Sequence, residues 1–353
     1  MEKAVYGGAG LARLPSGAVC FVEGALPGEA VEIKITEQKK DFAKATVASI
    51  LEPHKKRRVP HCPYYGKCGG CNAAHAEFEL QIEMLKQITH DLFQRIAKLN
   101  LPQNFEVHKG SEWGYRYRAQ VFKTKSNEIP WGFMARTSNA IIPIEKCPVL
   151  SENLNNFLAA SNSAKPNTKR SIFDNQSEKF LGKHIHADES VFFQSNLNLL
   201  PCLINSVKRA AGNGSILLDV FCGAGLFCAF LQSSFERVMA VEENPLCQKF
   251  AKKNLGSNCK FYAQSAENFF SENAIDLSNA CVLIDPPRPG LSNNICDFFC
   301  KAKPQKLIYV SCNPATLARD TRKFLNSGYE LASIEGFAFY PQTFHLEMLA
   351  VFC

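Results

Sequence analysis

Cys312 lies where an apolar β-type run meets the start of a helix, and we expect the chemistry there. The run at 306–311 ends at this cysteine, and Asn313 and Pro314 are a good N-cap and a good first helical residue. The sequence therefore predicts a helix over 314–326. Its positive dipole end would face the thiol and lower the pKa from about 8.5, which makes Cys312 a predicted nucleophile. A cysteine that only fills the core is the plain alternative.

A carboxylate near the C-terminus is the predicted base. The stretches 330–339 and 343–352 read as an antiparallel pair of strands that closes a sheet, with His345 and Glu347 on one face of the second strand. A carboxylate among Phe, Leu, Met and Val is costly unless it is used or paired. Burial would raise the pKa of Glu347 toward that of a base working near neutrality.

Several strand ends could bring further polar groups to Cys312. From residue 191 onward, strands alternate with helices, which predicts a parallel sheet with helices on both faces. Ligands bind outside the carboxyl ends of the strands in such sheets. The residues expected to converge there are Phe221, Glu242, Asp285 and Cys312.

The loop after the first of these strands, Cys222-Gly-Ala-Gly225, is typical of a nucleoside site. Gly223 and Gly225 let the backbone approach a ligand, and an acidic residue ending the next strand, Glu242, can bind ribose hydroxyls. This pattern fits NAD or S-adenosylmethionine. The latter is favoured because Cys228 replaces the third glycine of the dinucleotide motif and because Asp219 precedes the loop. The alternative for a single Gly-x-Gly is a tight turn.

Four cysteines have spacings that indicate metal. Cys62, Cys68 and Cys71 are spaced C-x5-C-x2-C, with two glycines between the last two, and 75 residues separate Cys71 from Cys147, which lies in a Lys-Cys-Pro sequence. Four thiolates can hold a zinc ion or a [4Fe-4S] cluster. Three close cysteines with one distant one favour the cluster, whereas zinc sites more often pair two C-x2-C units.

The rest of the N-terminal half is β-rich and basic. Residues 1–51 read as a small barrel of short strands separated by Gly and Pro. The basic run at 53–58 is either a solvated linker or a phosphate contact. A helix is predicted over 77–99, and 151–183 as a loop-rich join. Arginines and an aromatic side chain in the central strands could bind RNA, namely Arg116, Arg118, Trp131 and Arg136.

Composition places limits on the class of protein. The chain has 353 residues and a formal net charge of +7, which suits a polyanionic partner. It has no apolar run of eighteen residues and no signal-peptide core, so we expect a soluble cytoplasmic protein without membrane contact. Its 15 cysteines are then unlikely to form disulfides.

Four motifs together resemble the RNA 5-methyluridine methyltransferase family. They are Asp219-Val-Phe-Cys-Gly-Ala-Gly, Ile284-Asp-Pro-Pro-Arg-Pro-Gly, Val310-Ser-Cys-Asn-Pro-Ala-Thr-Leu-Ala-Arg-Asp and Phe339-Tyr-Pro-Gln-Thr-Phe-His-Leu-Glu. The sequence Val-Glu-Gly-Ala-Leu-Pro-Gly-Glu at 22–29 resembles that of the TRAM domain, an OB-like RNA-binding barrel. The resemblance covers nearly the whole chain. One departure is Leu226, which stands where the family often has Asn.

The resemblance implies a fold and a division of labour. Residues 1–52 would form the TRAM barrel, 53–190 a β-rich central domain with an iron–sulfur cluster, and 191–353 a Rossmann-like α/β methyltransferase domain. Cys312 would be the nucleophile and Glu347 the proton acceptor. The residues implied for S-adenosylmethionine are Gln194, Phe221, Gly223, Gly225, Glu242 and Asp285. Those implied for a [4Fe-4S] cluster are Cys62, Cys68, Cys71 and Cys147.

The implied reaction is methylation of uridine C5 in RNA through a covalent adduct between Cys312 and C6. Relatives with both a TRAM-like domain and the cysteine group act mostly on 23S rRNA, and some act on uridine 54 of the tRNA T-loop. We therefore expect 23S rRNA as the target. We also expect the protein to be a monomer. A 5-methylcytosine enzyme would carry a second cysteine where Arg288 stands. The alternative of another class is a non-catalytic RNA-binding iron–sulfur protein.

Overall fold

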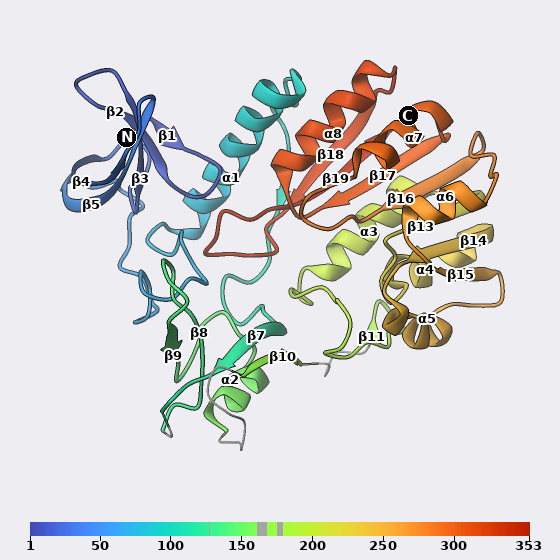
Figure 1. The fold of residues 1–353 in the computed structure, drawn as a ribbon, viewed down its shortest axis with the longest axis horizontal. Coiled ribbons are helices and arrows are strands. Elements are labelled where there is room, and N and C mark those ends of the chain that lie inside the picture. Colours follow the sequence, from blue (N-terminus) through green and yellow to red (C-terminus); the bar gives the residue numbers. More distant parts are fainter. Residues whose placement is uncertain (127, 161–167, 175–178) are drawn as a thin grey trace.

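The computed structural model describes residues 1–126, 128–160, 168–174 and 179–353. Figure 1 shows a small curved sheet at the N-terminus, a large α/β layer formed by the C-terminal half, and helix α1 between them; a second small sheet lies below. The catalytic motifs predicted from sequence all belong to the large layer.

The N-terminal strands form one five-stranded sheet in the order β1-β2-β3-β5-β4. Neighbouring strands are antiparallel except β3 and β5, which are parallel. The sheet encloses a core of small side chains around Cys20 and Val22. The strand bounds are β1 (Lys3–Ala4), β2 (Gly10–Arg13), β3 (Val19–Glu23), β4 (Ala30–Gln38) and β5 (Phe42–Glu52).

Two arginines of the basic run after this sheet form ion pairs within the protein. Arg57 makes two ion-pair contacts with the buried carboxylate of Glu29, at 2.5 and 2.7 Å. Burial alone would raise the pKa of Glu29, but Arg57 and the backbone N–H groups of Leu26 and His54 bring it below its usual value. Arg58 contacts Glu112. The predicted solvated linker is therefore wrong for these two arginines, while the phosphate contact stays a prediction.

A four-stranded sheet in the order β10-β7-β8-β9 forms the central region, with α2 (Glu152–Ala159) packed on it. Trp131 lies inside its core with no exposed surface, so the prediction that it stacks on a base is wrong. Arg118 is used internally, because its guanidinium donates to the carbonyls of Asp188 and Glu189. The strands are β7 (Arg118–Lys123), β8 (Trp131–Met134), β9 (Ile141–Pro143) and β10 (Lys169–Phe173).

The stretch 151–183, predicted to be a loop-rich join, is more regular than expected. It contains α2, β10, and the start of a two-stranded sheet formed by β11 (Lys179–Phe180) and β12 (Lys183–His184). Ser151 is the N-cap of α2 and accepts from the backbone N–H of Leu154, which explains where this helix begins. The parts of the predicted join at 161–167 and 175–178 lie outside the described residues.

The large sheet has eight strands in the order β15-β14-β13-β16-β17-β19-β18-β6. The first five of these are mutually parallel, and β19 runs antiparallel to both its neighbours. The bounds are β13 (Gly214–Val220), β14 (Phe235–Glu242), β15 (Cys259–Ala263), β16 (Ala280–Ile284), β17 (Lys306–Ser311), β18 (Leu331–Phe337) and β19 (Glu347–Phe352). The predicted parallel sheet is confirmed for β13, β14, β15, β16 and β17.

Helices cover both faces of the sheet, each through its own apolar core. One face carries α1 (Phe78–Leu92), α6 (Ala266–Glu272), α7 (Asn293–Ala302) and α8 (Pro314–Asn326). The other carries α3 (Leu200–Ala211), α4 (Leu226–Leu231) and α5 (Gln248–Asn254). The helix predicted at 77–99 is α1 followed by a π-helical turn, Phe93–Ala97, which ends where Lys98 has φ +56°.

The pair β18–β19 does not close the sheet as predicted. The edge next to β18 is occupied by β6 (Val107–His108), a short strand from much earlier in the chain that pairs in parallel. Residues 78–107 thereby contribute side chains to the same core as the C-terminal strands. Among the described helices, none has both the length and the apolar character needed to span a bilayer.

Candidate active site

The carboxyl ends of four parallel strands meet at one edge of the large sheet. Strands β13, β14, β16 and β17 end at or one residue before Phe221, Glu242, Asp285 and Cys312. The backbone N–H of Asp285 donates to the carbonyl of Val220, which joins the ends of β16 and β13. The sheet thus brings the predicted strand-end residues to one place, because parallel pairing aligns the ends of neighbouring strands.

The loop after β13 is held in conformations that few residues adopt. Phe221, Gly223 and Gly225 have φ values of +65°, +55° and +82°. A Cβ on Gly225 would lie 3.0 Å from the side chain of Leu255. The Glu242 carboxylate accepts from the N–H of Gly223 at 3.0 Å and from that of Asn244 at 2.9 Å. The acidic end of β14 therefore shapes the glycine loop, and a left-handed Phe221 indicates a functional constraint.

Three buried oxygens near this edge have no hydrogen-bond partner among the described residues: Gln194 Oε1, Asp219 Oδ1 and Glu347 Oε1. Gln194 is 3% exposed and lies in a loop. The backbone carbonyl of the next residue, Ser195, accepts from the N–H of Tyr117. The other oxygen of Asp219 accepts from the thiol of Cys228 at 3.1 Å. Burial raises the pKa of Asp219 to about 7. Unpartnered buried oxygens are costly, which is what a site built for a polar ligand would show.

Helix α8 begins as the sequence predicts. The Asn313 Oδ1 accepts from the N–H groups of Ala315 and Thr316, at 3.0 and 3.5 Å, and Pro314 is the first helical residue. The helix ends at Asn326, so the predicted range 314–326 is confirmed.

The predicted direction of the Cys312 pKa shift is wrong. Burial, together with the carboxyl groups of Glu347 and Asp285, raises the pKa of Cys312 to about 12. Arg288 acts in the opposite direction but does not outweigh them. Desolvation disfavours the charged thiolate more strongly than the helix dipole favours it. The thiol is therefore protonated at neutral pH in the ligand-free protein.

Glu347 lies near Cys312, where the pairing of β17 with β19 stops. Ser311 and Met348 form the last pair of these antiparallel strands, and Cys312 and Glu347 are the residues that adjoin this pair. Glu347 is 2% exposed, and burial, with a contribution from Asp285, raises its pKa well above 4.5, the direction expected from sequence. His345 does not share a strand face with it, because β19 begins at Glu347 and His345 lies in the irregular connection before this strand.

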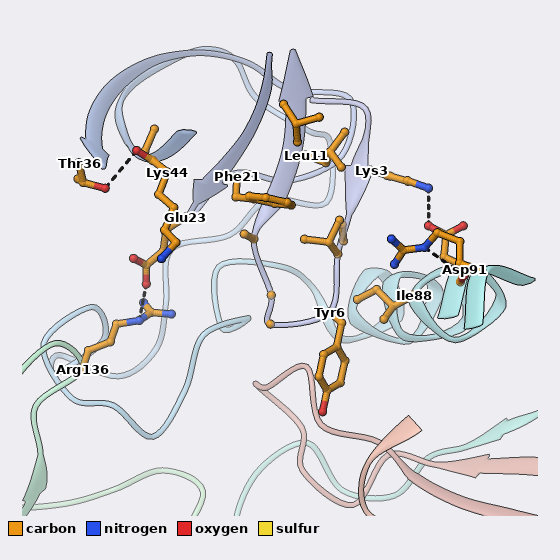
Figure 2. A pocket seen from close by; sticks show the side chains of 18 residues that line it. Lys3, Tyr6, Leu11, Phe21, Glu23, Thr36, Lys44, Ile88, Asp91 and Arg136 are labelled. Carbon is orange, nitrogen blue, oxygen red and sulfur yellow. Dashed lines mark hydrogen bonds and ion pairs between the residues drawn. The ribbon is translucent and has the colours of Figure 1, made fainter. Parts of the chain in front are cut away.

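Tyr6, which sequence reasoning missed, reaches this site from the N-terminal sheet. Its hydroxyl donates to Asn313 Oδ1 at 2.8 Å, and its ring meets that of Phe344 edge-on with centroids 5.2 Å apart. Figure 2 shows Tyr6 extending from the loop between β1 and β2 toward the C-terminal segment. Because 307 positions separate Tyr6 from Asn313, local sequence offers no sign of the contact.

The four predicted cluster cysteines line a single cavity of about 470 Å³, which also contacts Arg116 and Arg136. All four are half-buried. The pKa of Cys71 is raised to about 12, chiefly by burial and to a smaller extent by the neighbouring thiols of Cys147, Cys68 and Cys62. Across the described ranges, no three His, Cys, Asp or Glu side chains form a group that could hold a metal ion.

Comparison with known proteins gives a consistent family. Residues 173–352 match the family described as tRNA (uracil-5-)-methyltransferase, and residues 2–48 match the TRAM domain. The chain is 30% identical to an uncharacterised RNA methyltransferase of Treponema denticola, covering 99% of this chain and 97% of that one. It is also 30% identical to the 23S rRNA (uracil(1939)-C(5))-methyltransferase RlmD of Shewanella amazonensis, covering 98% and 93%.

A solved structure shares the fold along the full length of the chain. The tRNA (uracil-54, C5)-methyltransferase of Pyrococcus abyssi, solved with S-adenosyl-L-homocysteine, matches with a TM-score of 0.70 over 100% of this chain and 99% of that one. At 18% identity this likeness concerns the fold. The N-terminal sheet, the central region and the large α/β layer thus form an arrangement that also occurs in that enzyme.

Proposed function

The chain belongs to the tRNA (uracil-5-)-methyltransferase family, and from that premise we propose that it methylates carbon 5 of a uridine in RNA, with S-adenosylmethionine as methyl donor. The observation that carries this proposal is the position of Cys312 opposite Glu347 at the carboxyl edge of the sheet. A thiol facing a buried carboxyl suits addition to a uracil ring followed by elimination.

The proposed steps assign one task to each side chain. Carbon 5 of uracil is a weak nucleophile, so Cys312 first gives up its thiol proton to solvent and Sγ bonds to C6. The electron pair of the C5–C6 double bond then passes to C5 as an enolate. S-adenosylmethionine, when bound, would supply an electrophilic methyl group; C5 takes this group as the methyl–sulfonium bond breaks, which leaves S-adenosyl-L-homocysteine. Glu347 then removes the C5 proton, the C5–C6 double bond forms again, and the thiolate leaves C6. Arg288 favours the thiolate, since it is the cation that lowers the pKa of Cys312.

S-adenosylmethionine would be held by the strand-end residues and by the loop before α3. The unpartnered Gln194 Oε1 is a free acceptor for a ligand, and the left-handed backbone at Phe221, Gly223 and Gly225 allows close approach. Glu242 would bind the ribose hydroxyls and Asp285 the adenosine side. Leu226, at the start of α4, offers no polar contact where the family often has Asn.

We propose that Cys62, Cys68, Cys71 and Cys147 hold a [4Fe-4S] cluster. Two observations support this assignment. All four cysteines line one cavity. Burial raises the pKa of Cys71 and of Cys147, so their thiolates need a neighbouring cation to be stable. A single zinc ion would need the sulfurs about 2.3 Å from one point. A cubane is larger and holds cysteines further apart, which fits a cavity better than a closed tetrahedral group.

The RNA would approach along a groove between the N-terminal sheet and α1. This groove, of about 690 Å³, is lined by Lys3, Tyr6, Phe21, Lys44 and Arg136, among others. Figure 2 shows two of its cations already paired, Lys3 with Asp91 and Arg136 with Glu23, each at 2.5 Å. Phosphates could take over these partners, and aromatic rings in the groove could stack on bases. The target uridine must leave its stack to reach Cys312.

For the RNA class, we propose 23S rRNA, with the tRNA T-loop as the second candidate; the relatives named as 23S rRNA enzymes support the first. The test is incubation of the protein and donor with 23S rRNA and tRNA transcripts that contain 5-fluorouridine. Fluorine at C5 cannot leave as a cation, so a covalent complex should survive denaturation with wild type and be absent with Cys312→Ala. If neither RNA is trapped, the protein is a non-catalytic RNA-binding protein.

A further inference from the structure

Gln342 lies in the connection between β18 and β19 and has an unusual backbone. Its φ is +71° and it is fully buried. For a residue other than glycine, this left-handed backbone conformation costs about 1 kcal/mol or more in free energy. Such a conformation persists only when the surroundings hold it firmly, so the contacts of Gln342 define what holds this connection.

The backbone of Gln342 is bound on both sides by an earlier segment of the chain. Its carbonyl accepts from the N–H groups of Asn72 and Ala73, both at 2.9 Å, and its own N–H donates to Gln81 Oε1 at 2.8 Å. Asn72 immediately follows Cys71, and Gln81 belongs to α1. These bonds tie the connection to the cysteine-bearing segment.

The side chain of Gln342 makes a second set of bonds to the same segment. Its Oε1 accepts from Gln81 Nε2 at 3.0 Å and from Arg58 Nη2 at 3.1 Å, and its Nε2 donates to Glu112 Oε1 at 3.0 Å. The neighbouring carbonyl of Pro341 accepts from the Tyr115 hydroxyl at 2.9 Å. All these partners lie between residues 58 and 115.

The residues that follow Gln342 lead directly to the proposed base. The Thr343 hydroxyl accepts from the His345 N–H at 3.1 Å, and Glu347 comes two residues later as the first residue of β19. Cys312 is placed by β17 and α8, and within the described part of the chain no hydrogen bond joins Gln342 to either element. Pairing of β17 with β19 helps to place both reacting side chains, whereas the bonds of Gln342 hold only the connection that leads to Glu347.

We propose that Gln342 is a positioning residue that sets the place of Glu347 for proton removal and leaves Cys312 largely unaffected. The proposal rests on the proposed function and refines it: addition and methyl transfer depend on Cys312, whereas release of the product depends on the bonds between Gln342 and residues 58–112. Loosening those bonds should slow elimination selectively.

The test compares two steps of the reaction in Gln342→Ala and Gln342→Gly. Covalent trapping by 5-fluorouridine RNA reports addition and methyl transfer, whereas tritium release from RNA carrying [5-³H]uridine reports proton removal. We expect trapping within about threefold of wild type, tritium release reduced tenfold or more, and accumulation of a covalent complex on ordinary RNA. Glycine relieves the φ strain but restores no side-chain bond, so it should behave like alanine. Gln305→Ala, at an exposed position, is the control.

Several results would overturn the proposal: unchanged tritium release, an equal loss in both assays, or wild-type release by Gln342→Gly. If both Gln342 variants fail to fold, Gln81→Leu removes the same side-chain pairing from the α1 side and is judged by the same two assays. A failure of the proposed function is distinguishable, because wild-type protein itself would then neither trap 5-fluorouridine RNA nor release tritium.

Discussion

The Tyr6 hydroxyl donates a 2.8 Å hydrogen bond to Asn313 Oδ1, the same oxygen that caps helix α8 one residue after Cys312. The loop between β1 and β2 therefore contacts the turn that carries Cys312, the proposed nucleophile. Tyr6 also lines the groove beside α1, so it links the proposed RNA groove to this turn.

Tyr6→Phe removes only the hydroxyl and keeps the ring against Phe344. We expect a loss of about 1 kcal/mol in the free energy of unfolding, the usual value of one hydrogen bond, and a lower rate of covalent trapping. Urea denaturation and 5-fluorouridine trapping measure the two effects. Tyr117→Phe, which loses a 3.3 Å exposed bond to Asn198, is the matched control and should change stability by less. Equal effects of the two variants would contradict a special role for Tyr6.

Glu347→Gln should abolish turnover but retain trapping, because only the proton acceptor is lost. A drop of at least 100-fold in tritium release, with trapping by 5-fluorouridine RNA retained, is the expected result, in line with the usual contribution of a general base. Parallel loss of both signals would mean that Glu347 serves addition as well.

The same variant tests whether Glu347 makes the stability of the protein depend on pH. The folded-state pKa of Glu347 lies above 4.5, so the folded protein keeps a proton that the unfolded chain releases. Wild-type stability from this group is fully present below pH 4.5 and is lost as pH rises toward the folded pKa. Glu347→Gln lacks this loss and should be more stable than wild type at pH 8, with little difference at pH 4.5. Urea denaturation at both pH values is the measurement; a larger gain at the lower pH would refute the sign.

Alkylation of Cys312 should be slow at neutral pH. With a pKa of about 12, the thiolate is scarce at pH 8, and iodoacetamide should label Cys312 at least tenfold more slowly than the exposed Cys353, with a rate that still rises at pH 10. Arg288→Ala should slow the labelling further, because Arg288 lowers this pKa. Peptide mass spectrometry separates the two sites. A rate that levels off below pH 9 would restore the thiolate expected from the helix dipole.

Iron content tests the proposed cluster. Protein purified without oxygen should be brown, absorb broadly near 400 nm (a rough value for cubane clusters) and contain about four iron atoms per chain. Cys71→Ser and Cys147→Ser should lose most of the iron, whereas Cys202→Ser, a half-buried cysteine outside the cavity, should keep it. Colourless protein with one zinc ion per chain would replace the cluster by zinc.

The sequence by itself determined the features that depend on near neighbours in the chain. The Asn313 cap and Pro314 specify where helix α8 begins, because capping and the fixed φ of proline act within one turn. The alternation of strands and helices after residue 191 specifies a parallel sheet, and parallel pairing then brings Phe221, Glu242 and Asp285 to one edge.

Only the tertiary structure decided what those residues meet. The burial of Trp131, the use of Arg57 by Glu29, and the bonds of Tyr6 and Gln342 all join segments far apart in the sequence, where no local pattern acts. The pKa of Cys312 is the clearest case. A helix dipole is a local property and was visible in the sequence, but desolvation and the facing carboxyl of Glu347 arise only when β19 pairs with β17, and these raise the pKa.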